Sequence, residues 1–246
     1  MPRSSEAARR RPSDAWLLMA WLGGAAFVVS LALFLYRYAV TFGTAHSHLV
    51  SAPALLDTAM FTIFALHHSV FARTGVKRVI SRAVPPWFER SLFTWVASLL
   101  FIVVVLAWQP VDGVIYRVPD GWRWLGYAAQ IVGILLTIRG SSALDVLDLA
   151  GVRQVMDARR NANPRHVPLE THGVYGLVRH PLYFGWALFV FGSPLMTGTR
   201  AVFALASTLY LAIAIPFEER ALIHVFGDAY RAYQQRTRWR FIPGIW

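Results

Sequence analysis

The stretch from Trp16 to Tyr36, WLLMAWLGGAAFVVSLALFLY, contains no charged residue. A helix needs about 20 predominantly apolar residues to cross the hydrocarbon core of a bilayer. The run follows an arginine-rich segment but is longer than the apolar core of a cleavable signal peptide. We therefore expect this stretch to form a retained transmembrane helix.

Further apolar runs extend this pattern along the chain. They cover residues 52–72, 91–108, 124–138, 182–197 and 201–217. The last three runs are short, so they span a bilayer only if they are tilted, extended by flanking residues or matched by a thinner membrane. With 56% hydrophobic and 15% charged residues, the chain is also more apolar than an ordinary soluble domain. The sequence thus predicts an all-α, multi-pass integral membrane helical bundle with five to six transmembrane helices.

The basic residues are distributed unevenly around these runs. With six spans, only Arg37, Arg117, Arg123 and Arg200 of the 24 Lys and Arg residues fall on one side of the membrane. The positive-inside rule places the other side, with both termini, in the cytoplasm. Residues 1–13 are then a basic cytoplasmic tail, and residues 14–246 form a single membrane domain.

The net charge of +11 has a membrane explanation. Its arginines sit beside the apolar runs, where they set topology and contact lipid phosphates. No aromatic-interleaved basic module is present, so nucleic acid is not an expected partner. The absence of cysteine excludes a disulfide, a thiolate metal site and a thiol nucleophile. The histidines lack a metal-binding spacing such as HExxH, and we expect no metal site.

Two charged segments border the last two apolar runs. They read GVYGLVRHPLYFG at 173–185 and FEERALIHVFGDAYRAY at 217–233. Pro181 is suited to the first turn of a helix, and the turn residues at 197–199 predict a helical hairpin. The hairpin returns Glu218 and Glu219 to the level of Arg179 and His180. Beyond it, apolar residues spaced three and four apart predict a cytoplasmic amphipathic helix.

Charged groups at the edge of hydrocarbon indicate a functional site. Together with Tyr175, Tyr183 and a small-residue opening at Gly185, the four charged residues suit a zwitterionic ligand. Carboxylates bind an ammonium group or ribose hydroxyls, an arginine clamps a carboxylate, and an aromatic ring faces a cationic sulfonium. S-adenosylmethionine carries all of these groups. Two alternatives need no ligand. Arg179 could only extend its side chain to the membrane interface, and the glutamate pair could only begin a solvated helix.

RHPLYFG followed by EERALIHVFGDAYRAY resembles the C-terminal signature of membrane methyltransferases, which include isoprenylcysteine carboxyl methyltransferase and phospholipid N-methyltransferases. The resemblance implies an enzyme with a cytoplasm-facing S-adenosylmethionine pocket in about residues 140–240. Its first motif is matched by five residues and its second by two. These are Arg179, His180, Pro181, Tyr183 and Gly185, then Glu218 and Glu219.

The N-terminal half resembles a bacterial branch that contains methanethiol S-methyltransferase and NnrU-type proteins. The matching segments are residues 64–91, WQP at 108–110 and DLAGVRQV at 148–155. His67 and Ala150 depart from the branch, where we expect a glutamine and an aromatic residue. The resemblance implies a bacterial inner membrane and a small thiol as methyl acceptor. The alternatives are a lipophilic acceptor, such as an isoprenylcysteine carboxylate or an amine phospholipid, and a non-catalytic NnrU-like protein of nitrogen-oxide metabolism.

A thiol acceptor must react as its thiolate, because the thiol is a weak nucleophile. Arg153 and Arg179 are candidates for lowering the thiol pKa, and His68 or His180 for receiving the proton. Since adjacent residues on a helix cannot face the same point, at most one of His67 and His68 is expected to line a site.

Overall fold

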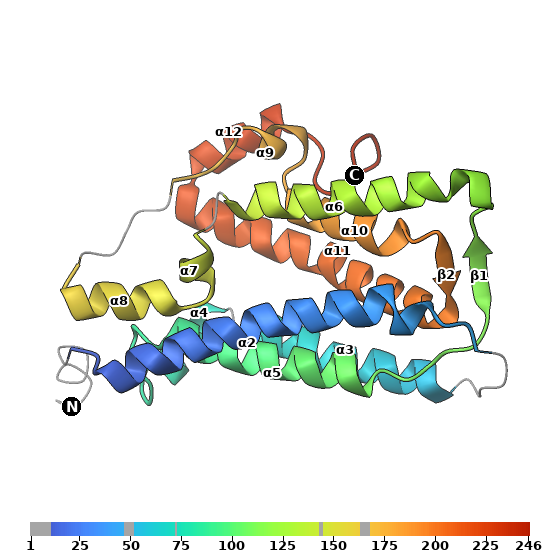
Figure 1. Cartoon of the computed structure of the whole chain (residues 1–246). Coiled ribbons are helices and arrows are strands. Elements are labelled where there is room, and N and C mark those ends of the chain that lie inside the picture. Colours follow the sequence, from blue (N-terminus) through green and yellow to red (C-terminus); the bar gives the residue numbers. More distant parts are fainter. Residues whose placement is uncertain (1–10, 47–51, 72, 143–144, 163–167) are drawn as a thin grey trace. The chain divides into compact units, whose positions relative to one another are not determined.

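The computed structural model describes residues 11–46, 52–71, 73–142, 145–162 and 168–246 (Figure 1). Helices dominate, and two short strands form the sheet. In chain order the elements are α2 (Asp14–Ala39), η1 (Thr41–Gly43), α3 (Ala52–Phe71), α4 (Thr74–Ile80), α5 (Glu89–Ala107), β1 (Val114–Arg117), η2 (Asp120–Trp122), α6 (Arg123–Ser142), α7 (Val146–Leu149), α8 (Val152–Arg160), α9 (Val174–Leu177), α10 (Pro181–Phe191), β2 (Leu195–Thr197), α11 (Gly198–Phe226) and α12 (Asp228–Arg236).

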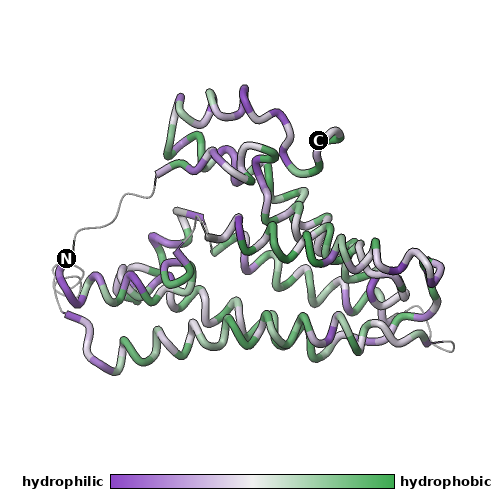
Figure 2. Tube along the Cα trace, turned by 45° about the horizontal axis from the view of Figure 1, so that its top comes forward, coloured by the Kyte–Doolittle hydropathy of each residue, from purple (hydrophilic) through white to green (hydrophobic). Residues whose placement is uncertain are grey.

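Four helical stretches in the described part of the chain are long and apolar enough to cross a membrane. They cover Asp14–Gly43, Pro53–Phe71, Glu89–Ala107 and Gly198–Phe226. Their outward faces carry exposed apolar side chains, such as Leu55 at 76% and Leu209 at 62% exposure. Figure 2 shows hydrophobic residues along the long helices. These findings confirm an all-helical membrane protein.

The expected count of five to six spans is not confirmed. The two remaining apolar runs form α6 and α10, but α10 has 11 residues. At 1.5 Å per residue it extends about 16 Å, roughly half of a 30 Å hydrocarbon core. The 20 residues of α6 include Arg123, Gln130 and Arg139, which dilute its apolar character.

The chain divides into two compact units. The first comprises the described residues of 1–39, 60–108 and 144–166. In it α2 packs against α5 and α8, around a core of Ala20, Phe88, Ala150, Val152 and Val155. Gly151 adopts φ +78°, and a side chain there would collide with the backbone of Ser91. The glycine therefore lets the start of α8 lie directly on the start of α5.

The second unit comprises the described residues of 40–59, 109–143 and 167–246. Here α6 packs along α10 (Figure 1). A Cβ on Gly133 would lie 2.5 Å from the Gly185 carbonyl oxygen, and one on Gly185 would lie 2.6 Å from the Gly133 oxygen. Small residues at facing positions allow such close approach of two helices in a membrane. The site segment at the start of α10 is thereby fixed to α6.

The predicted C-terminal hairpin is formed by α10 and α11, with β2 between them. β2 pairs antiparallel with β1 in the register Val114↔Thr197, Tyr116↔Met196 and Arg117↔Leu195, with an irregularity between Val114 and Tyr116. The Thr197 side chain then accepts a hydrogen bond from the Arg200 amide and caps α11. Helix α11 continues past the apolar run to Phe226 and ends at Gly227, whose φ is +56°. The amphipathic helix expected from Glu218 is thus divided into the last turns of α11 and the separate α12.

Candidate functional site

An ion pair joins the two charged segments. Arg179, just before α10, donates from Nε to Oε1 of Glu219 on α11 at 2.6 Å. The two residues are only 8% and 3% exposed. Burial makes such a pair costly to separate, because either charge alone would remain without its partner. The structure therefore brings Arg179 and Glu219 together as the hairpin predicts.

The chain that follows α12 returns alongside this pair. The amides of Arg179 and His180 donate to the carbonyls of Trp239 and Arg240, each at 2.9 Å. Arg179 Nη1 also donates to the carbonyl oxygens of Thr237 at 2.7 Å and Arg238 at 2.9 Å. The C-terminal segment thus binds both the backbone and the side chain of the arginine.

Further cations and donors surround the buried carboxylate. Glu219 Oε2 lies 3.3 Å from Nε of Arg240 and accepts a hydrogen bond from Gln234 at 3.2 Å. His180 Nε2 lies 3.5 Å from Glu219 Oε1. Sequence reasoning missed Gln234, Arg240 and the carbonyls of 237–238. Arg240 is indistinguishable in sequence from the other arginines of a basic tail, and a backbone carbonyl has no sequence signal.

Glu218 has different surroundings from its neighbour. Its side chain is 46% exposed, and Oε2 lies 3.5 Å from Nδ1 of the buried His180. Tyr183 donates its hydroxyl to the same oxygen at 2.7 Å. The rings of His180 and Tyr183 stack with centroids 5.3 Å apart and an interplanar angle of 15°. Glu218 therefore presents an oriented carboxylate, beside a pair of stacked rings, at an accessible position.

Tyrosines from α9 and α12 lie close enough to this group to interact electrostatically with its glutamates. Tyr233 donates to the Tyr175 carbonyl at 2.7 Å, and Tyr175 donates to the Gly140 carbonyl at 3.0 Å. Burial raises the pKa of Tyr175, Tyr230 and Tyr233 above the ordinary tyrosine value. The phenols consequently remain neutral hydrogen-bond donors throughout the physiological range.

Pro181 and Gly185 act on α10 itself. Pro181 occupies the first turn of the helix, where its missing N–H costs no hydrogen bond. The space beside Gly185, expected to be an opening, is occupied by Gly133 and Thr137 of α6. Gly185 therefore sets the packing of the helix that begins at the site.

The remaining candidates belong to the first unit. Arg153 forms an ion pair with Asp145, so a carboxylate already compensates its charge. His68 is exposed and lies near the rings of Phe64 and Phe93, with centroids 5.8 and 5.2 Å away. No group of three or more His, Cys, Asp or Glu side chains able to hold a metal occurs among the residues that the structure describes.

Comparisons with known proteins show the family of the chain. Residues 121–229 match the family model described as phospholipid methyltransferase. The chain is 34% identical to methanethiol S-methyltransferase of Pseudomonas deceptionensis, over 74% of this chain and 70% of that protein. It is 31% identical to methanethiol S-methyltransferase of Mycobacterium tuberculosis, over 87% and 92%. A Nurim homolog of Drosophila melanogaster is 25% identical over 66% and 67%. No solved structure matches.

Proposed function

Because this chain belongs to the family of membrane methyltransferases that contains the methanethiol S-methyltransferases, we propose that it transfers a methyl group from S-adenosylmethionine to a small thiol. The family establishes a membrane methyltransferase, and the donor and acceptor are the proposed part. The similarity to methanethiol S-methyltransferases favours methanethiol as acceptor and dimethyl sulfide as product.

The observation that carries the donor assignment is the contrast between Glu218 and Glu219. Glu218 is accessible and oriented by Tyr183 and His180, whereas Glu219 is buried against Arg179. An accessible carboxylate accepts from the ammonium or ribose hydroxyls of the donor. The stacked rings of Tyr183 and His180 offer a face to its sulfonium. We assign donor contact to these three residues.

The other expected donor residues position this contact group. Arg179 and Glu219 tie the start of α10 to α11 and to the C-terminal segment. Tyr175, Pro181 and Gly185 fix the local backbone through a hydrogen bond, a helix start and a helix contact. The donor-binding part predicted for residues 140–240 thereby divides into contact and positioning groups.

The acceptor sulfur must lose its proton as it attacks the methyl group. A sulfur–carbon bond forms at the acceptor while the sulfonium–methyl bond of the donor breaks, which leaves S-adenosylhomocysteine. Alignment of the two partners supplies much of the acceleration. Arg153 and Arg179 remain the predicted cations for the thiolate, and His68 and His180 the predicted proton acceptors. Separate Asn substitutions of the two histidines test this, since only the loss of the base removes the rise of kcat with pH.

The donor assignment is tested by binding S-adenosylhomocysteine to the purified protein. We expect Glu218→Ala to abolish binding while the variant unfolds like the wild type, because the side chain is half-exposed. Arg220→Ala, which changes the next exposed charge on α11, is the matched control and should bind normally. Unchanged affinity in Glu218→Ala would refute the donor assignment.

The acceptor is tested by measuring dimethyl sulfide in the headspace of cells supplied with methanethiol. Cells with the wild-type chain should release it, and cells with Glu218→Ala should not. The match to phospholipid methyltransferases makes an amine lipid the second candidate acceptor. If the cells contain methylated phospholipid and release no dimethyl sulfide, the acceptor is the lipid and not the thiol.

We also propose a bacterial inner membrane, with both termini in the cytoplasm. The support is the positive-inside distribution, in which few basic residues besides Arg117 and Arg123 fall on the outer side. Alkaline phosphatase fused after Arg117 should be active, and the same enzyme fused after Trp246 should be inactive. The reverse result would overturn the orientation.

A further inference from the structure

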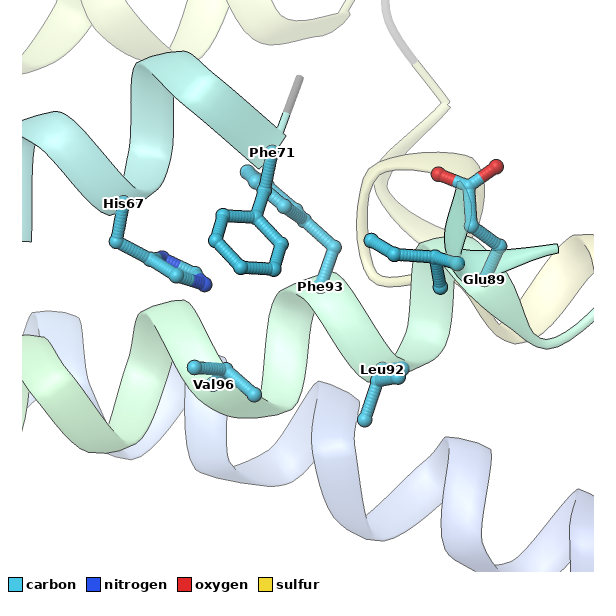
Figure 3. A pocket seen from close by; sticks show the side chains of 7 residues that line it. His67, Phe71, Glu89, Leu92, Phe93 and Val96 are labelled. Atoms are coloured by element: carbon cyan, nitrogen blue, oxygen red, sulfur yellow. The ribbon is translucent and has the colours of Figure 1, made fainter. Parts of the chain in front are cut away.

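A small cavity lies within the first unit, between the end of α3 and the start of α5 (Figure 3). Its volume is about 80 Å³. Phe71, Leu92, Phe93 and Val96 supply apolar walls, and His67 points into it from α3. The cavity falls in and just after the 64–91 segment, which resembles the thiol-methylating branch.

His67 leaves polar atoms unsatisfied at this cavity. Both ring nitrogens are buried and have no hydrogen-bond partner among the described residues. The ring itself is held between Phe71, with centroids 4.4 Å apart, and Phe93, at 5.8 Å and an interplanar angle of 16°. A buried polar group without a hydrogen-bond partner destabilises the folded protein. The histidine is therefore fixed in place with free capacity for a hydrogen bond to a bound molecule.

The size of the cavity limits what this molecule is. A protein cavity of roughly 150 Å³ holds benzene, so 80 Å³ admits a molecule of only a few heavy atoms. A prenyl chain or a phospholipid is far too large. The walls of Phe71, Phe93, Leu92 and Val96 favour an apolar body, and His67 requires one polar atom on it.

The ion pair at the cavity edge favours a neutral ligand. Glu89 lines the cavity and pairs with Lys77 at 3.4 Å. Because Lys77 compensates the carboxylate, this pair gives the cavity no net charge with which to hold an ionic ligand. A neutral imidazole offers one lone pair and one N–H, so a weak donor such as S–H finds its acceptor on His67.

We propose that this cavity binds the small alkyl thiol acceptor in its neutral form, with the S–H group donating to His67. The inference rests on the proposed function and deepens it. His67 is then the histidine that holds the bound thiol. The alkyl group lies against Val96 and the two phenylalanines, and the cavity volume excludes longer thiols.

The test changes the cavity volume at one position in both directions. Val96→Phe fills the cavity, and Val96→Ala enlarges it. Leu99→Phe and Leu99→Ala are matched controls, because Leu99 lies on the same helix and is 50% exposed. His67→Phe retains a ring for stacking and removes the hydrogen bond. Each variant is assayed for kcat/KM with methanethiol, ethanethiol and propanethiol, and for S-adenosylhomocysteine affinity.

We expect Val96→Phe to lower kcat/KM for methanethiol at least about tenfold, because one extra or missing methylene group in an apolar pocket changes kcat/KM by about that factor. Val96→Ala should raise the propanethiol-to-methanethiol ratio of kcat/KM by about the same factor. His67→Phe should raise KM roughly fivefold, the scale of one hydrogen bond. S-adenosylhomocysteine affinity and both Leu99 variants should match the wild type.

The outcomes separate the two proposals. If the wild type methylates thiols but the chain-length preference is the same in both Val96 variants, the cavity assignment is refuted and the proposed function stands. If the wild type methylates no thiol at all, the proposed function fails, and this inference fails with it. Should Val96→Phe not fold, the preference of Val96→Ala alone decides the cavity assignment.

Discussion

Removal of the Glu219 carboxylate should destabilise the protein strongly. Glu219→Ala leaves the Arg179 guanidinium, which is 8% exposed, without its ionic partner at 2.6 Å. Breaking a buried pair from one side costs about 3–5 kcal/mol. Because Arg179 keeps the carbonyls of Thr237 and Arg238 as acceptors, we expect a loss near the lower end, about 3 kcal/mol.

The assay is equilibrium unfolding by SDS in mixed micelles, with Glu218→Ala as the adjacent control. Glu218 is 46% exposed, so its removal should cost about 1 kcal/mol or less. Replacing both charges, in Arg179→Met with Glu219→Leu, should recover part of the stability, because an apolar pair often replaces a buried ion pair without loss but the carbonyls of Thr237 and Arg238 lose the arginine as donor. Equal stability of the Glu219→Ala and Glu218→Ala variants would refute the reasoning.

Three further predictions follow from other contacts of the second unit. Gly133→Ala forces a methyl group against the Gly185 carbonyl, and circular dichroism melting should show a loss of about 1–3 kcal/mol, typical of overpacking. Tyr183→Phe removes the hydrogen bond that orients the exposed carboxylate, so calorimetry should show S-adenosylhomocysteine binding weakened roughly fivefold. Burial raises the pKa of Tyr230 and Tyr233, so the stabilisation from their protonation is complete below pH of about 10 and is lost above it. The part of the tyrosinate absorbance that is lost in the Tyr230→Phe and Tyr233→Phe variants should appear only as the protein unfolds.

The membrane character and the meeting of the two motifs were predictable from the sequence. A long uncharged apolar run such as 16–36 is stable as a helix in the hydrocarbon core of a membrane. This run forms most of α2. The meeting of Arg179 with Glu219 follows from topology alone, because a hairpin returns its second helix to the level where the first began. Neither inference needs side-chain detail, and both are confirmed by the fold.

The parts that escaped prediction depend on backbone groups and on helix length. The carbonyls of 237–240 hold Arg179 and His180, but every residue has a carbonyl and none is marked in the sequence. The sequence also predicted a span that ends at Phe217 and an amphipathic helix after it, whereas α11 continues without a break to Phe226. The polar continuation is stabilised by tertiary contacts such as the ion pair at Glu219, which hydropathy does not register.

Adjacent polar residues in the two parts of the chain divide their roles in the same way. Successive helix residues are rotated by about 100°, so a pair of like residues cannot face one point. Glu219 faces inward to Arg179 while Glu218 is accessible. His67 faces inward to the cavity while His68 is exposed. When two identical residues are adjacent on such a helix, one therefore faces inward and the other outward. The burial of each side chain shows which is which. In our proposals, the outward glutamate contacts the soluble donor and the inward histidine contacts the apolar acceptor, so each residue would meet the ligand that matches the polarity of its surroundings.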